Sequence, residues 1–497
     1  MKRNTLTTAV LAGLTGLAGM ASVSHAVNLN PDGLGQVLIY PYYTARGGND
    51  TLFSVVNTTA KAKAVKVRFI EALNSREVLD FNLYLSPYDV WVAAITETDA
   101  GGGQLLIPDT SCTVPYFQGG VPGNIGVQPF LNFQYTGARS DGGPQGIERT
   151  ASGYLEMIEM GTLVGNAAAG ATHVGGVPAS CALVNSYWAS GGPWRANPNF
   201  ELEPVEGGLF GGASILNVAE GTMFSYNATA IDSFWEFGSI GSHTDPGSLV
   251  PDLNSGDTTS NVFLTGVAMV DTQTWPAGVF ALNATLTFDE LFNEYIVDPD
   301  LAARSEWVVT FPTKRFHTDD APGGAFVPPG APIPPFTRTW SQPACEDMEL
   351  RVWDREEREP EGEIIISPPP PQVGFFLCRE ANVIRFSRDS IVPDQTEILK
   401  EIRRDGGFTH LSYTNFELPA GFDSGWVKFD LTTIPTGGSR LSVPANTTGV
   451  RYAGLPTVGF WVQRYTNGTL LDDAGTSVLS NYASAFEHRG SRRIVSD

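Results

Sequence analysis

The stretch Ala64-Val-Lys-Val-Arg-Phe69 decides the fold class of this chain, because its apolar and charged side chains alternate. Val65, Val67 and Phe69 occupy one set of positions, and Lys66 and Arg68 occupy the other. An alternation with a period of two predicts a half-buried β-strand. Residues 79–85, Leu-Asp-Phe-Asn-Leu-Tyr-Leu, repeat the pattern and predict a second strand soon after the first.

Further short strands are expected on both sides of this pair. Residues 37–43 predict a strand that ends at Pro41 or just beyond it, and residues 52–56, 90–95 and 154–158 predict others. Turn signals such as Ser86-Pro87 separate them. In the second half, apolar alternation marks strands at residues 307–311, 348–352, 383–386, 427–431 and 458–462. Many short strands with turns between them are typical of antiparallel β-sandwiches.

One or two short helices are expected as well. Thr287-Phe-Asp-Glu290 has the spacing of a capping box, in which each end side chain bonds a free backbone N–H of the other. Apolar residues follow at helical spacing until Pro299, so the sequence predicts a helix between these two points. The tail at residues 479–488 is a candidate for a short closing helix.

The chain length and the distribution of glycine and proline suggest two large β domains. A chain of 497 residues can bury more than one core. We expect a first β-sandwich over residues 27–305, interrupted by a Gly-rich insertion of long loops at about 99–200, and a second β-rich domain over residues 306–497. The Pro-rich stretches 327–336 and 368–371 read as extended connectors.

The N-terminus predicts a cleaved export signal over residues 1–26. Lys2 and Arg3 precede an uncharged, mainly apolar stretch, and Ser24-His25-Ala26 supplies small residues for a cleavage site. The alternative, a membrane anchor, is weakened by the Gly and Thr residues that interrupt the stretch. No other stretch approaches spanning length. We therefore expect export across the inner membrane, to a periplasmic, cell-surface or extracellular location.

The four cysteines predict disulfide bonds in an exported protein. Cys112, Cys181, Cys345 and Cys378 are dispersed, and none lies in a C-x-x-C pair. Three pairings are possible. We favour Cys112–Cys181 with Cys345–Cys378, because each bridge then closes a loop within one region of the chain.

The sequence offers little evidence for catalysis or for a cofactor. It lacks a G-x-S-x-G elbow, a P-loop and an H-E-x-x-H pair. A formal charge of −22 argues against binding to nucleic acid. Calcium is the best cofactor hypothesis: Asp252, Asn254 and Asp257 partly resemble an oxygen-ligand loop, although the glycine is misplaced and the closing acid is missing.

Two sets of segments resemble known secreted proteins. Ser54-Val-Val-Asn-Thr-Thr59, Ala64-Val-Lys-Val-Arg-Phe69 and the strand that ends at Leu85 resemble immunoglobulin-like modules of secreted bacterial proteins. The segment 307–316, Ala344-Cys-Glu346 and the segment 377–382 resemble uncharacterised secreted proteobacterial proteins. The resemblance implies an immunoglobulin-like sandwich and an envelope or extracellular location. It implies no activity.

These features favour a non-enzymatic envelope or extracellular protein with a structural or adhesive role. Its expected partners are components of the cell surface or matrix, glycans, or a second copy of itself. Two alternatives remain open. Exposed Trp side chains on a sandwich would favour a carbohydrate-binding protein, and a site built across loops would favour a secreted hydrolase.

Overall fold

The computed structural model describes residues 25–117, 125–264, 269–322, 326–360, 366–367, 375–389, 391–403, 413–434, 437–471 and 473–496. The first 24 residues of the expected export signal lie outside this range. The fold is 45% strand and 10% helix, which confirms the expectation of a mostly β protein. Its strands pair antiparallel within the named sheets, except for one parallel pair described below. The immunoglobulin-like topology stays a prediction.

Two sheets form a first sandwich. The eight-stranded sheet runs in the order β1 (Asn28–Leu29), β16 (Thr229–Asp232), β2 (Val37–Thr44), β10 (Ser152–Leu163), β4 (Lys63–Glu71), β5 (Glu77–Leu85) and β8 (Cys112–Val114), with β13 (Leu202–Glu203) paired to β10. The six-stranded sheet runs β15 (Thr222–Asn227), β14 (Leu209–Asn217), β3 (Asn49–Asn57), β6 (Val90–Glu97), β7 (Gly103–Ile107) and β9 (Gly126–Pro129).

Aromatic side chains fill the space between these two sheets. Phe53 of β3 lies 5.6 Å, centroid to centroid, from Phe69 of β4. Trp91 of β6 lies 5.7 Å from Phe81 of β5. Phe69 and Phe81 belong to the alternating stretches that predict the strands, so the expected apolar faces do form the core.

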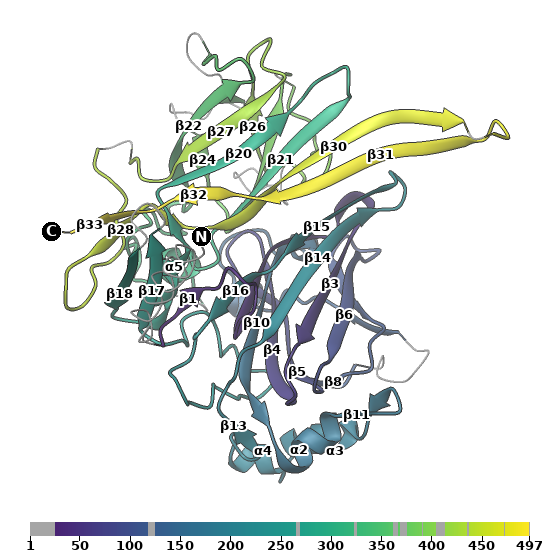
Figure 1. The fold of residues 1–497 in the computed structure, drawn as a ribbon, viewed down its shortest axis with the longest axis vertical. Helices are drawn as coiled ribbons and strands as arrows, with labels where there is room; N and C mark the ends of the chain where they lie inside the picture. Colours follow the sequence, from purple (N-terminus) through teal and green to yellow (C-terminus); the bar gives the residue numbers. More distant parts are fainter. Residues whose placement is uncertain are drawn as a thin grey trace, which may run out of the picture.

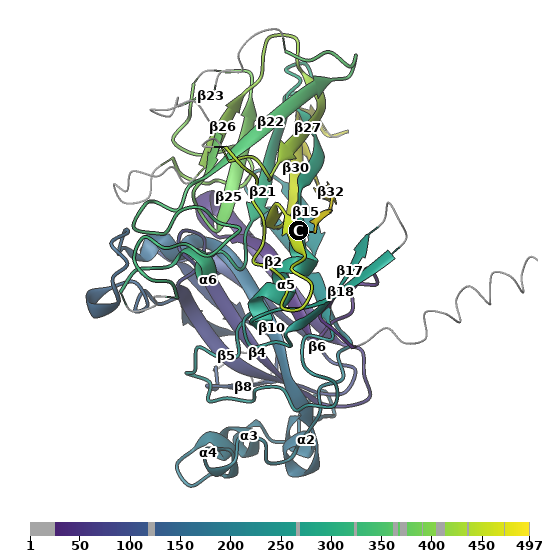
Figure 2. The same cartoon turned by 90° about the vertical axis from the view of Figure 1, so that its left-hand side faces the viewer.

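A second sandwich is stacked on the first (Figures 1 and 2). Its five-stranded sheet runs β24 (Phe375–Leu377), β22 (Glu346–Asp354), β27 (Ser424–Asp430), β20 (Glu290–Ile296) and β32 (Arg489–Ser491). Its six-stranded sheet runs β23 (Ile366–Ser367), β26 (Tyr413–Glu417), β25 (Ala381–Ser387), β21 (Ala303–Thr310), β30 (Val458–Leu471) and β31 (Ser477–Glu487), with β25 and β26 parallel. The expected domain boundary at residues 305/306 falls within β21.

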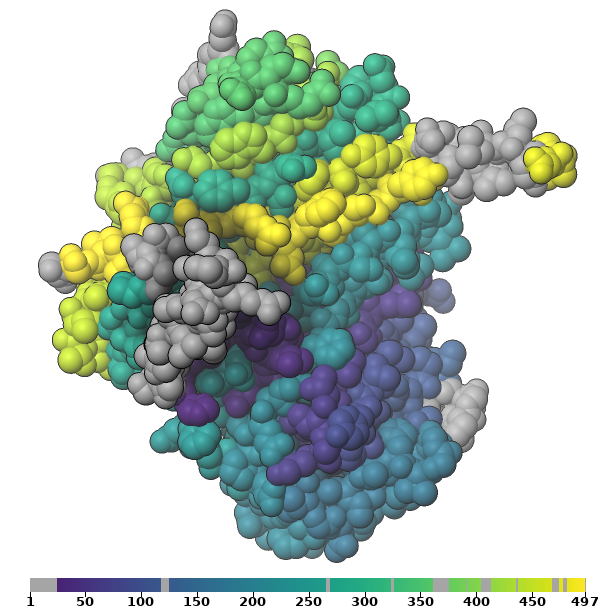
Figure 3. Space-filling model, viewed as in Figure 1, coloured from purple at the N-terminus to yellow at the C-terminus, as the bar shows by residue number. Residues whose placement is uncertain are grey.

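In the six-stranded sheet of the second sandwich, the central strands β21 and β25 are buried on both faces. Trp307 of β21 packs inward, 5.0 Å from Phe429 of β27. Its neighbour Val308 belongs instead to the core cluster of the first sandwich, as does Phe460 of β30. Phe460 stacks on Tyr226 of β15 with the ring centroids 4.7 Å apart. The two sandwiches therefore share one continuous apolar core, and strands β30 and β31 lie along the seam between them (Figure 3).

Short elements complete the fold. The α-helices of the described residues are α2 (Gly165–Ala171), α3 (Cys181–Trp188), α4 (Pro193–Ala196), α5 (Gly278–Leu286) and α6 (Arg315–Thr318). Single turns of 3₁₀-helix are η2 (Arg46–Gly48), η3 (Gly137–Arg139) and η4 (Ile147–Ala151). Four two-stranded pairs are β11 (His173–Val174) with β12 (Val177–Pro178), β17 (Thr259–Leu264) with β18 (Met269–Thr274), β19 (Thr287–Phe288) with β29 (Leu455–Pro456), and β28 (Arg451–Ala453) with β33 (Arg493–Val495).

Both helix predictions are wrong. Glu290 begins strand β20, and the helix of this region, α5, ends before Thr287. The Thr287 hydroxyl donates back to the Asn283 carbonyl at the end of α5, so this residue closes a helix instead of opening one. The tail from Leu479 onward lies in strand β31.

The expected insertion at 99–200 is more ordered than a set of long loops. It supplies β10, which pairs with both β2 and β4 inside the eight-stranded sheet. It also supplies the helical unit α2–α4, which lies against one end of the first sandwich (Figures 1 and 2). The strand expected at residues 154–158 is confirmed, although it is longer than expected.

Strand β4 is not half-buried as the alternation predicts. Lys66 and Arg68 are as fully buried as the valines between them. Their face of the sheet is covered by a loop, whose Pro246 carbonyl accepts a hydrogen bond from Lys66. A buried layer of charged side chains therefore covers the face of the eight-stranded sheet that points away from the apolar core.

Candidate functional site

The outer face of the six-stranded sheet in the first sandwich is almost free of charge. The strands of this sheet contain two charged residues, Asp50 and Glu97. The outward positions carry aliphatic, hydroxyl and small side chains. The strand register places six of them in one row across the sheet: Ser225, Ser214, Leu52, Ala94, Leu106 and Val127.

Several apolar side chains of this face are open to solvent. Leu52 is 42% exposed, Val92 is 38% exposed and Met223 is 60% exposed. A hollow of about 420 Å³ lies over β3, β6, β14 and β15, with Leu52, Val92 and Ser214 on its walls. We call this surface the outer apolar face. A contiguous apolar surface of this kind marks an interaction site more often than a solvated one.

Sequence reasoning missed this surface. Strand 52–56 was expected, but an outward face without charge was not. The sequence did contain a signal for it. In β3 and β6, the residues that point to one face of the sheet and those that point to the other are almost all uncharged.

A pair of stacked Trp side chains lies on the outer face of the second sandwich. Eight of the ten Trp side chains are buried. The other two, Trp353 of β22 and Trp426 of β27, face each other across the strands and stack with centroids 4.2 Å apart and a 10° angle between the rings. Trp426 is 40% exposed. The Arg351 guanidinium covers Trp353 at 5.1 Å.

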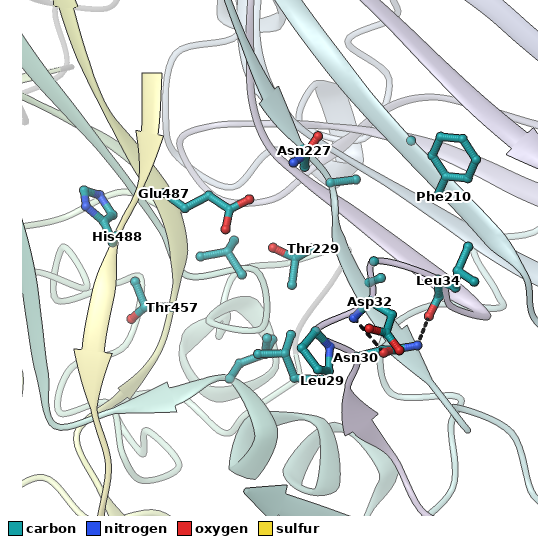
Figure 4. Close-up of a pocket in the computed structure, with 18 of the residues that line it drawn as sticks. Leu29, Asn30, Asp32, Leu34, Phe210, Asn227, Thr229, Thr457, Glu487 and His488 are labelled. Atoms are coloured by element: carbon teal, nitrogen blue, oxygen red, sulfur yellow. Dashed lines mark hydrogen bonds between the residues drawn. The ribbon is translucent and has the colours of Figure 1, made fainter. Parts of the chain in front are cut away.

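A cleft of about 580 Å³ lies between the two sandwiches. Figure 4 shows its lining, with Asp32 and Glu487 on opposite sides. Asp32 comes from the loop after β1, and Glu487 ends β31. This cleft is the place where a hydrolase site built across loops would lie, because two carboxylates line it.

The three calcium candidates each have a partner within the protein. Asp252 forms an ion pair with Arg315 at 3.3 Å. The Asn254 side chain accepts a hydrogen bond from the Val279 N–H in the first turn of α5. The Asp257 side chain accepts one from the Thr259 N–H. Among the described residues, no three or more His, Cys, Asp or Glu side chains gather as a possible metal site. Calcium binding here stays a prediction.

Both predicted disulfides are confirmed. Cys112 is bonded to Cys181, which joins strand β8 to the first residue of helix α3. Cys345 is bonded to Cys378 beside the five-stranded sheet. Each bridge stays within one region of the chain, as expected.

The adjacent Ser242-His243-Asp245 does not form a catalytic group. The His243 ring is buried, and its two nitrogens bond the Tyr84 hydroxyl and the Pro198 carbonyl. The Asp245 carboxylate instead contacts Arg195. The structure thus separates side chains that are adjacent in the sequence.

Comparisons with known proteins do not add to this description. No family model, no curated protein and no solved structure matches this chain. Within the described part of the chain, no helix combines the length and the apolar character needed to cross a bilayer.

Proposed function

We propose that this chain is an exported, non-catalytic structural protein that associates with a second copy of itself through the outer apolar face. The observation that carries the proposal is the scarcity of charge on that face in a strongly acidic protein. The expected export signal and two disulfides support a location outside the cytoplasm.

The chemistry of the face favours another β-sheet as its occupant. It has no cations that would attract anionic lipids or nucleic acid, and no row of aromatic rings for sugars to stack on. Sheet faces pack about 10 Å apart through interdigitating side chains. The alternation of Leu52 and Val127 with Ser214 and Ala94 supplies large and small neighbours for such packing.

The net charge favours this face over the rest of the surface for contact between two copies. Two copies with a formal charge of −22 each repel one another over most of their surfaces. Repulsion is weakest where the surface carries the least charge, so close contact is least costly at the outer apolar face. High salt screens the remaining repulsion and should strengthen the association.

Sedimentation of the mature, disulfide-bonded protein tests the proposal. We expect reversible self-association that increases with salt. In the double variant Leu52→Lys, Val92→Lys, the dissociation constant should rise at least about tenfold, because lysines would be buried in the contact. Val218→Lys is the matched control, since Val218 is 77% exposed outside this face. A wild-type protein that stays monomeric, or a double variant that associates equally well, would contradict the proposal.

The stacked Trp pair supports a second candidate function, binding of a saccharide. One face of Trp426 is taken by Trp353, and the ring remains 40% exposed. A rigid aromatic surface with polar neighbours such as Glu359, which accepts from the Trp353 indole N–H at 2.9 Å, suits the apolar face and hydroxyl rim of a sugar ring.

A glycan array tests this second function. We expect binding that Trp426→Ala reduces at least about tenfold, which corresponds to roughly 1.4 kcal/mol. Phe263→Ala is the control, because Phe263 is a 49% exposed ring on the separate strand β17. If the wild-type protein binds no glycan on a broad array, the saccharide hypothesis is wrong. That result would not bear on the proposal of self-association.

A further inference from the structure

The charged layer beneath the eight-stranded sheet contains a lysine and an aspartate in direct contact. In the register of β4 and β5, Arg68 lies opposite Asp80 and Lys66 lies opposite Asn82, so Lys66 and Asp80 are diagonal neighbours. The Lys66 Nζ contacts the Asp80 carboxylate. Nζ also donates to the Pro246 carbonyl at 2.8 Å. These contacts hold the amine against the Oδ2 atom of the Asp80 carboxylate, next to the carbon that it would attack.

A β-bulge brings a second carboxylate to the same face. Phe69 pairs with Leu79 and Ile70 pairs with Glu77, so one extra residue, Val78, is accommodated in β5. The bulge turns Glu77 toward the face of Asp80, which strict alternation would not allow. Glu77 accepts from the Arg68 Nε at 2.7 Å.

Burial favours the neutral forms of the diagonal pair. The Lys66 side chain is fully buried and the Asp80 side chain is 16% exposed. Burial lowers the pKa of Lys66, although Asp80 and Glu77 oppose this effect. Burial and then the Glu77 charge raise the pKa of Asp80 to about 7. A neutral amine is a nucleophile, and a protonated carboxyl group can lose its hydroxyl as water.

We propose that Lys66 and Asp80 become joined by an amide bond after the chain folds. Lys66 Nζ attacks the carboxyl carbon of Asp80, a C–N bond forms and the C–OH bond breaks. One proton passes from Nζ to the departing hydroxyl, and one water leaves. The Glu77 carboxylate is the nearby group that can relay this proton. The N–H that remains on Nζ keeps its hydrogen bond to the Pro246 carbonyl.

Fixed proximity lowers the entropic barrier that the condensation faces in solution. Holding two reacting groups in contact converts a bimolecular condensation into an effectively unimolecular one. The partial exposure of Asp80 gives the released water a way out. The reaction needs no oxidant and no cofactor, so it suits a protein that has been exported and folded.

A second buried pair on the same sheet provides a contrast. Lys63 of β4 contacts Glu159 of β10 at 2.8 Å, and both side chains are fully buried. The Glu159 carboxylate also accepts the backbone N–H groups of Glu206 and Gly207, at 3.2 and 2.8 Å. Burial raises the pKa of Glu159, but these donors oppose that rise because they stabilise the carboxylate anion, which is a poorer acyl donor than the acid. In the described part of the chain, no backbone N–H is found to donate to Asp80.

Peptide mass spectrometry of the folded, exported protein tests the linkage. After reduction and tryptic digestion, we expect no cleavage after Lys66. We expect instead a branched peptide in which the fragments that carry Lys66 and Asp80 are joined with the loss of one water. Recovery of a linear peptide ending at Lys66, together with an unlinked Asp80 peptide, would overturn the proposal.

Three variants separate the linkage from a simple ion pair. Lys66→Arg keeps the charge and must abolish the branched peptide, whereas Lys63→Arg must leave it intact. Glu77→Gln should lower the linked fraction if Glu77 relays the proton. The same digest reports both disulfides, so a variant that fails to fold is recognised. Wild-type protein alone decides the main question, and its result is independent of self-association.

Discussion

A directional chain of hydrogen bonds around His243 shows how single residues hold distant segments together. The Trp188 indole N–H donates to the Tyr84 hydroxyl at 2.8 Å, and the hydroxyl bonds the His243 Nε2 at 3.1 Å. The other ring nitrogen, Nδ1, bonds the Pro198 carbonyl at 2.6 Å. Because a carbonyl only accepts, Nδ1 carries the proton and Nε2 is left to accept from Tyr84. This series of hydrogen bonds thus requires the neutral form of the His243 imidazole.

This histidine should make stability depend on pH. Burial lowers the pKa of His243 to about 4, whereas a histidine in an unfolded chain has a pKa of about 6.5. Between these values the unfolded state binds the extra proton, so the contribution is complete above pH 6.5 and is lost as the pH falls toward 4. The expected loss is about 3 kcal/mol.

Chemical denaturation at a series of pH values measures this effect. The wild-type protein should exceed His243→Gln in free energy of unfolding at pH 7, and the gap should narrow toward pH 4. His173→Gln is the control, because His173 lies outside the chain of hydrogen bonds. A gap that stays constant with pH would show that His243 does not titrate as described.

At the scale of elements, the same residues fit a helix or a strand until their partners are known. Leu291, Phe292, Tyr295 and Ile296 are spaced for one side of a helix. In β20 they divide between the two faces, with Leu291 and Tyr295 buried and Phe292 and Ile296 partly exposed. Pairing of this segment with β27 and β32 satisfies its backbone groups, and local spacing contains no information about those partners.

The helical unit α2–α4 depends on the Cys112–Cys181 bridge. The bridge spans 69 residues and ties the start of α3 to the edge strand β8. The helices are short, so their own hydrogen bonds stabilise them little. Replacing both cysteines by serine should cost about 2–4 kcal/mol.

Amide hydrogen exchange shows which elements lose stability when the Cys112–Cys181 bridge is removed. Amide exchange should rise in α2, α3 and α4 and stay unchanged in the central strands β4 and β10. The Cys345→Ser, Cys378→Ser variant is the matched control, and it should leave the three helices protected. Equal protection of the helices with and without the Cys112–Cys181 bridge would contradict this account.

At the scale of the whole molecule, the two sandwiches behave as one packing unit. Thr310 of β21 donates to the Pro41 carbonyl of β2 at 2.6 Å, and the Tyr42 hydroxyl donates to Glu401 at 2.9 Å. Together with the stacking of Tyr226 on Phe460, these contacts fix one sandwich against the other. The same packing leaves the outer apolar face uncovered, because the second sandwich meets the first along a different side (Figure 1).

The sequence by itself determined the class of the fold and the pairing of the cysteines in two disulfide bonds. Period-two alternation at residues 64–69 and 79–85 is a local property, so it predicts β4 and β5 without knowledge of their partners. The dispersed cysteines predicted both bridges, because each pair lies within one region of the chain. The candidate calcium residues were found by type and spacing, which do not show what each side chain contacts.

Only the tertiary structure decided which faces are buried and which are free. Lys66 and Arg68 read as solvent-facing, yet a distant loop covers them and turns their face into a charged interior. Leu52 and Val92 read as ordinary strand residues, yet nothing in the described chain covers them. Burial depends on contacts between segments far apart in the sequence, and alternation reports only that two faces differ. The outer apolar face and the Lys66–Asp80 pair therefore emerge only from the folded chain.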